Sequence, residues 1–145
     1  MSLVDGVHPL WKRFLKNKLL AWSGVVLWMA VIFAFSAQAH SGEITEAVLG
    51  PANLLVRKSA HMTEYFILYV LLRHAFRLSE PRSSSFWPFL IAALYAATDE
   101  YHQIFVPGRS ATVSDVLVDS IGACAGWFFV SYFAALRSFC SRTRS

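Results

Sequence analysis

Four stretches of the chain are apolar over a length that would cross the hydrocarbon core of a bilayer, which takes about 20 helical residues. The stretches cover residues 19–36, 60–76, 86–106 and 113–136. The second of them is the least apolar because His61 and Glu64 interrupt it. The four stretches predict an all-α fold, an integral membrane bundle of four antiparallel transmembrane helices. The connecting segments are predicted as outer loops at 37–59 and 107–112 and an inner loop at 77–85.

Residues 8–18 mix aromatic and aliphatic side chains with cations, a pattern typical of a short amphipathic helix at a membrane surface. We therefore divide the chain into an interfacial segment (1–18), a membrane domain (19–136) and a basic cytoplasmic tail (137–145). The alternative is a secretory signal cleaved at the small-x-small sequence Ala37-Gln38-Ala39. An anchor fits better, because the apolar run exceeds the roughly 7–15 residues of a signal and contains two tryptophans.

The composition supports a membrane protein. Hydrophobic residues make up 56% of the 145-residue chain and charged residues only 15%. Soluble domains average about 45–50% hydrophobic and about 25% charged residues, so this chain has too few charged residues to cover the surface of a globule of its size. The same figures exclude a disordered, collagenous or coiled-coil protein. The two cysteines are too few for a disulfide framework.

The basic residues are distributed unevenly between the two sides of the predicted bundle. Of the 13 lysines and arginines, only Arg57, Lys58 and Arg109 lie on the side away from the termini. Because cytoplasmic loops carry the excess of positive charge, both termini are predicted to be cytoplasmic. The net charge of +4 does not indicate a nucleic-acid partner, since the basic residues flank apolar runs rather than alternate with exposed aromatic residues.

Polar residues from three predicted spans and one loop collect at the outer end of the bundle. Spacings of three place His61 and Glu64 on one helix face, and likewise Glu100 and Gln103. A charged side chain at the bilayer centre costs about 2.5–3.5 kcal/mol, so such groups face the bundle interior or water and pair with one another. The predicted binding site consists of Lys58, His61, Glu64, Tyr65, Asp99, Glu100, Gln103, Arg109, Asp115 and Asp119. We expect a polar pocket that opens outward, with His102 at the same depth.

Pro107-Gly108 predicts a tight turn after the third span, because proline presets φ at turn position i+1 and glycine tolerates a positive φ at i+2. Such a turn would fold Arg109 over the mouth of the pocket. The candidate N-caps of the fourth helix are Ser110, Thr112 and Ser114. The spacing of Gly122 and Gly126 is interpreted as close helix packing.

Three motifs occupy this polar region: RKSAHMTEY at 57–65, TDEYHQIFVPGR at 98–109 and DVLVDSIG at 115–122. With the FSAQ sequence at 35–38, they resemble the VanZ-like family over about residues 25–135. The chain departs from the family pattern at Asp119, where asparagine is expected, which adds a negative charge. The resemblance implies a small multi-pass protein of the bacterial cytoplasmic (inner) membrane. One member of that family lowers sensitivity to the glycopeptide teicoplanin.

The polar cluster and the resemblance are compatible with three functions. The first is recognition or processing of a partner from the cell envelope: a lipid headgroup, an envelope precursor or a glycopeptide. The second is metal-assisted chemistry on a lipid-linked phosphate, since one imidazole with several carboxylates suits Mg²⁺ or Mn²⁺. The third is a purely structural polar network between helices.

The sequence assigns no catalytic residue, no metal ligand and no cofactor. It contains no His-Glu-x-x-His motif and no closely spaced pair of cysteines. A proton-coupled transporter is disfavoured, because the polar residues stop near one end of the bundle instead of continuing through it. Enzyme activity and oligomeric state are left open.

Overall fold

All regular structure in the described part of the chain is helical. The computed structural model describes residues 17–109 and 112–143 and, for 41–44, the backbone only. The helices are α2 (Lys18–Ser36), α3 (Ser41–Leu49), the 3₁₀ helix η1 (Gly50–Ala52), α4 (Asn53–Ser79), α5 (Phe86–Gln103) and α6 (Val113–Arg142). The all-α prediction is confirmed.

Each predicted span overlaps one long helix: α2, α4, α5 or α6. Among the described helices, α2 and α6 are long and apolar enough to cross a membrane. Both also carry large apolar side chains on their outer surfaces, among them Val26, Leu27, Phe128 and Phe139. Large apolar patches are rare on soluble monomers, so this surface indicates association with a membrane.

The segment predicted as the outer loop 37–59 is largely helical, so that prediction is wrong. It contains α3, η1 and the first turns of α4. His40 precedes α3 with a φ of 56° and Gly50 follows it with a φ of 54°, so two positions of positive φ turn the chain into and out of this helix. The sequence SGEITEAVL of α3 is short and largely polar at its start, so it has no long apolar pattern to indicate a helix.

The N-terminus of α2 is capped by Asn17. Its side-chain oxygen accepts hydrogen bonds from the backbone N–H groups of Leu19 (2.9 Å) and Leu20 (3.5 Å), two donors that have no partner within the helix. The amphipathic helix predicted for 8–18 lies outside the described residues except for its last two. At the other end of the chain, α6 continues through Arg142, so the predicted tail begins as helix.

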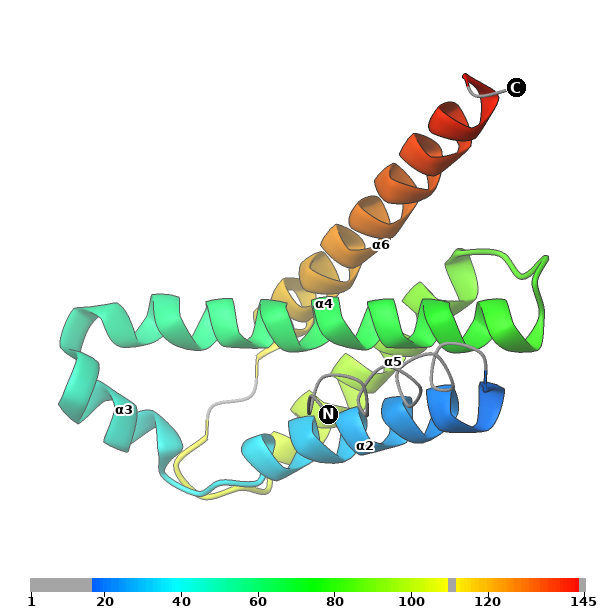
Figure 1. Cartoon of the computed structure of the whole chain (residues 1–145). Helices are drawn as coiled ribbons and strands as arrows, with labels where there is room; N and C mark the ends of the chain where they lie inside the picture. Colours follow the sequence, from blue (N-terminus) through cyan, green and yellow to red (C-terminus); the bar gives the residue numbers. More distant parts are fainter. Residues whose placement is uncertain (1–16, 110–111, 144–145) are drawn as a thin grey trace, which may run out of the picture.

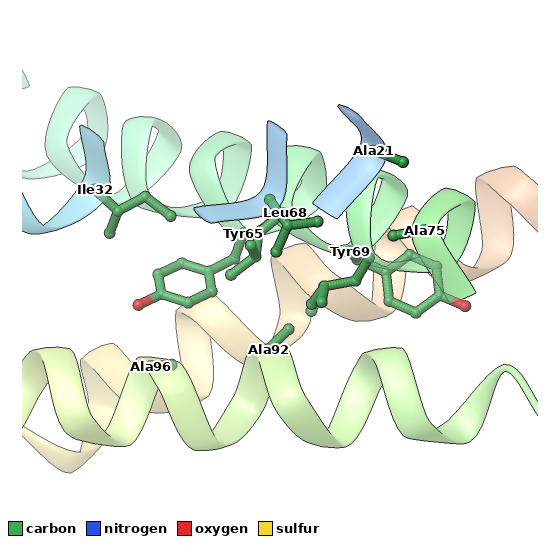
Figure 2. Close-up of a cluster of buried hydrophobic side chains, with 11 residues drawn as sticks. Ala21, Ile32, Tyr65, Leu68, Tyr69, Ala75, Ala92 and Ala96 are labelled. Carbon is green, nitrogen blue, oxygen red and sulfur yellow. The ribbon is translucent and has the colours of Figure 1, made fainter. Parts of the chain in front are cut away.

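Helix α4 is central and packs against α2, α5 and α6. In Figure 1, α2 and α5 run antiparallel to α4, while α6 crosses α4 and diverges from the other helices toward its C-terminus. Every residue from Ser131 to Thr143 is accordingly exposed. The core lies where α4 faces α2 and α5 (Figure 2), and it includes Ile32, Tyr65, Leu68, Tyr69, Ala92 and Ala96.

Two glycines let α6 approach α4 closely. A Cβ atom at Gly122 would collide with the backbone carbonyl of Met62, and one at Gly126 would lie 2.9 Å from the carbonyl oxygen of Phe66. The packing interpretation of these glycines is confirmed. The close approach also brings Asp119, one turn before Gly122, against the face of α4 that carries His61.

Candidate functional site

A small cavity between α4, α5 and α6 collects six of the ten predicted site residues. It has a volume of about 70 Å³, and we call it the acidic pocket. Its lining consists of Leu54, Arg57, Lys58, His61, Glu100, Gln103, Asp115, Val118 and Asp119. These residues meet because the beginnings of α4 and α6 and the end of α5 lie toward the same end of the fold (Figure 1).

Three side chains of the acidic pocket, those of His61, Glu100 and Asp119, lie close together. Asp119 has no exposed surface and Glu100 is 5% exposed. His61 Nδ1 lies 3.3 Å from Asp119 Oδ1, without the alignment of a hydrogen bond. The backbone N–H of Thr112 donates to Glu100 Oε2 at 3.2 Å. One donor atom from each of His61, Glu100 and Asp119 lies within 4.8 Å of the other two, so the group could hold a metal ion.

The rim of the acidic pocket is more exposed and carries one ion pair. Lys58 Nζ lies 4.0 Å from Asp115 Oδ1, and both side chains are partly exposed. Thr112 is the N-cap residue of α6, but its hydroxyl donates to Asp115 Oδ2 at 2.8 Å rather than capping a backbone N–H. Asp115 lies in the first turn of α6, where the helix dipole favours a negative charge. Of the other predicted caps, Ser110 lies outside the described residues.

A second cavity adjoins the acidic pocket and is lined by two arginines. It has a volume of about 290 Å³, and we call it the basic recess. Its lining consists of Phe35, Ser36, Gln38, Thr45, Arg57, Ala60, His61, Glu64 and Arg109. The two cavities share Arg57 and His61, so a ligand in one would lie next to a ligand in the other.

Arg109 is held in the basic recess by the turn that precedes it. The Arg109 backbone N–H donates to the Val106 carbonyl at 3.2 Å, and Gly108 has a φ of 73°, which confirms the turn predicted at Pro107-Gly108. The guanidinium donates from Nη2 to the Phe35 carbonyl at 2.6 Å. Burial lowers the pKa of Arg109, and the neighbouring Arg57 lowers it further, although an arginine stays charged.

Asp99 belongs to a hydrogen-bond network between α2 and α5. Its Oδ2 atom accepts hydrogen bonds from the Ser36 hydroxyl at 2.6 Å and from Gln103 Nε2 at 3.1 Å. Gln103 Oε1 in turn lies 3.5 Å from Arg109 Nη1. This network links the buried ends of α2 and α5 to the turn that carries Arg109. Such a network is what the structural alternative predicts for this part of the cluster.

Eight of the ten predicted residues line one of the two cavities, and Tyr65 and Asp99 line neither. The eight are Lys58, His61, Glu64, Glu100, Gln103, Arg109, Asp115 and Asp119. Tyr65 lies in the core (Figure 2). Its ring centroid is 6.3 Å from that of Tyr95. His102 was expected at the depth of the site, but it packs against α2, with its ring centroid 4.4 Å from that of Phe33.

Arg57 lines both cavities and is absent from the predicted site. In the sequence analysis Arg57 begins the RKSAHMTEY motif and is counted among the three cations on the outer side of the bundle, but it is not included in the predicted site. The spacing could have identified it, because Arg57 precedes His61 by four residues and Glu64 by seven, which places all three on one helix face. Ser36 was also missed, since no spacing connects the end of α2 to α5.

Comparison with known proteins places the chain in a family. Neither the curated proteins nor the solved structures contain a significant match to it. The sequence profile of the VanZ/LLP1 family matches residues 20–135, which include both cavities and nearly all of the described helices. The resemblance inferred from the motifs is confirmed, and the chain belongs to the VanZ/LLP1 family.

Proposed function

We propose that the protein spans the bacterial cytoplasmic membrane four times, with both termini in the cytoplasm, and binds the phosphate-bearing headgroup of a cell-envelope lipid in the basic recess. Three observations support this location and orientation: the family, the apolar surfaces of α2 and α6, and the ten of 13 cations on the side of the termini. Helices α4 and α5 would complete the bundle with their polar residues turned inward.

The observation that carries the proposal is the pair of arginines in the basic recess. Within the described part of the chain, neither Arg57 nor Arg109 forms an ion pair with a carboxylate. Arginine presents a planar set of donors that matches phosphate, and such charge-assisted bonds are about twice as strong as neutral ones. A phosphate between the two guanidinium groups would satisfy both charges in a site partly removed from water.

Glu64 would add specificity to the same recess. Its carboxylate lines the cavity together with the two arginines, and its backbone carbonyl accepts a hydrogen bond from Trp28 Nε1 at 2.9 Å. A carboxylate accepts hydrogen bonds but donates none. It therefore suits a sugar hydroxyl or an amine attached to the phosphate, rather than a second phosphate.

The size of the basic recess favours a headgroup over a whole glycopeptide. Pockets that enclose drug-sized ligands measure about 300–1,000 Å³, and this cavity of about 290 Å³ lies just below that range. A glycopeptide antibiotic is much larger than such a ligand. The teicoplanin tolerance expected from the family would then result from control of a lipid-linked precursor rather than from capture of the drug.

The proposal is tested by lipid binding to the purified full chain in detergent, with EDTA present. The probes are a polyisoprenyl monophosphate and the uncharged polyisoprenol of the same length. We expect the phosphate to bind at least about tenfold more tightly than the alcohol, and Arg57→Gln and Arg109→Gln to abolish that difference. Arg137→Gln, in the exposed C-terminal part of α6, is the matched control and keeps it. Equal affinity for the two lipids would contradict the proposal.

A further inference from the structure

Asp119 is a buried carboxylate for which the described part of the chain supplies no hydrogen-bond donor. The residue has no exposed surface, and neither Oδ1 nor Oδ2 accepts a hydrogen bond within the described chain. A buried charge without a partner is strongly unfavourable, so such groups are normally paired or bind a cation. The nearest cationic candidate, His61, also has Nδ1 without a hydrogen bond, although this atom lies 3.3 Å from Asp119 Oδ1.

We propose that the acidic pocket binds one divalent cation, Mn²⁺ or Mg²⁺, through His61 Nδ1, a carboxylate oxygen of Glu100 and a carboxylate oxygen of Asp119. The three donor atoms come from α4, α5 and α6 and lie within 4.8 Å of one another. Ligands at about 2.0–2.2 Å from a single ion lie at most about 4.4 Å apart, so side-chain shifts of a few tenths of an ångström would complete the coordination.

The donor set and the charges select the class of ion. Two carboxylates favour a hard cation of the Mg²⁺ and Mn²⁺ type, and the imidazole favours Mn²⁺ within that class. The charges of Glu100 and Asp119 together balance one divalent ion. The third acid of the pocket, Asp115, is paired with Lys58 at the rim and is therefore not needed for that balance.

The pocket also has room for an ion and is held in shape around it. Its volume of about 70 Å³ exceeds the roughly 30 Å³ that one water molecule occupies in the liquid, so a cation and a remaining water fit together. The Thr112 backbone N–H orients the Glu100 carboxylate. Gly122 holds α6 against α4 one turn from Asp119, which fixes the distance between the ligands of these two helices.

This cation site is independent of the headgroup proposal, because it consists of side chains that need no lipid to meet. His61 lines both cavities, however, so an ion in the acidic pocket would lie next to a phosphate in the basic recess. Such a neighbour would attract the phosphate and orient it. Lipid binding and metal binding can therefore be measured separately, and one proposal can fail while the other holds.

The test uses the full chain purified in detergent, stripped with EDTA and dialysed, without lipid. Mn²⁺ is titrated, and binding is followed by loss of the electron paramagnetic resonance signal of the free ion. We expect one ion per chain and, in pulsed spectra, a coupling to a coordinated imidazole nitrogen that disappears in His61→Gln. Mg²⁺ should displace the bound Mn²⁺. We expect Asp119→Asn to weaken binding at least about tenfold.

Glu80→Gln is the control for a general loss of negative charge, since Glu80 is exposed beyond the other end of α4; this variant should bind Mn²⁺ like the native chain. Asparagine keeps the shape of aspartate, so Asp119→Asn tests charge rather than packing. Without metal, the variant should unfold at a higher temperature than the native chain, and Mn²⁺ should stabilise only the native chain. Substoichiometric binding at millimolar Mn²⁺, or unchanged affinity in Asp119→Asn, would overturn the proposal.

Discussion

The Ser36 hydroxyl donates a hydrogen bond of 2.6 Å to Asp99 Oδ2 and so joins the end of α2 to α5. Both side chains are buried, and Gln103 donates to the same oxygen. Asp119 is equally buried but receives no hydrogen bond from any residue that the structure describes. The two aspartates at one end of the bundle therefore differ: Asp99 joins α2 to α5 through Oδ2 and leaves only Oδ1 without a hydrogen bond, whereas both carboxylate oxygens of Asp119 lack one among the described residues.

Removal of the Ser36 hydroxyl should destabilise the fold. Ser36→Ala deprives the buried Asp99 of its shortest hydrogen bond, and the loss of a partner from a buried polar group costs about 1–3 kcal/mol. We expect a lower free energy of unfolding in a denaturant titration in detergent. Ser131→Ala, at an exposed position of α6, is the control and should change it by at most about 0.5 kcal/mol. Equal stability of the two variants would show that the Ser36 bond contributes nothing.

The long helices could be predicted from the sequence because length and apolarity alone decide whether a segment suits a bilayer. α3 and η1 could not, since a nine-residue helix with a polar first half has no apolar run to distinguish it from a loop. The turn at Pro107-Gly108 could be predicted, because proline and glycine restrict the backbone locally and need no information about neighbouring helices.

The candidate site could be predicted only as far as helical spacing reaches. Spacing shows which residues share a face of one helix, and this brought together His61 with Glu64 and Glu100 with Gln103. It does not show which neighbour that face meets. Asp99 is turned toward Ser36 by the rotation of α2 against α5, a tertiary relationship that no local pattern encodes.

Gly122→Ala should separate α6 from α4. The added Cβ would collide with the Met62 carbonyl, which is backbone and cannot move aside like a side chain. We expect a loss of about 1–3 kcal/mol in unfolding free energy, as for other overpacked interiors, together with weaker Mn²⁺ binding because Asp119 moves with the helix. Ala125→Leu adds carbon to an exposed face of the same helix and should preserve both properties. Unchanged Mn²⁺ affinity in Gly122→Ala would show that the close packing of α6 on α4 does not position Asp119 for the cation.

Gly108→Ala should disturb the basic recess through the turn that positions Arg109. The backbone has a φ of 73° there, and the added Cβ would lie 2.7 Å from the His40 ring. Left-handed backbone alone costs a non-glycine residue about 1–2 kcal/mol. Gly50→Ala is the control for backbone strain without a side-chain clash, because Gly50 also has a positive φ, of 54°, but open space around its Cβ position. We expect both variants to lose stability, but only Gly108→Ala to lose affinity for the polyisoprenyl phosphate. If Gly108→Ala and Gly50→Ala bound the polyisoprenyl phosphate with the same affinity, the turn would not control the position of Arg109.

The proposed orientation predicts which cysteines a membrane-impermeant maleimide can reach in intact cells. The native cysteines are first replaced by serine. Glu64→Cys lines the basic recess and should be labelled from outside, whereas Glu80→Cys, at the opposite end of α4, should react only after the membrane is permeabilised. Tyr65→Cys, in the buried core next to position 64, should resist labelling in both conditions and so controls for nonspecific access. Labelling of Glu80→Cys in intact cells, with Glu64→Cys protected, would reverse the orientation and place the recess on the cytoplasmic side, where it could not meet a lipid headgroup of the outer leaflet.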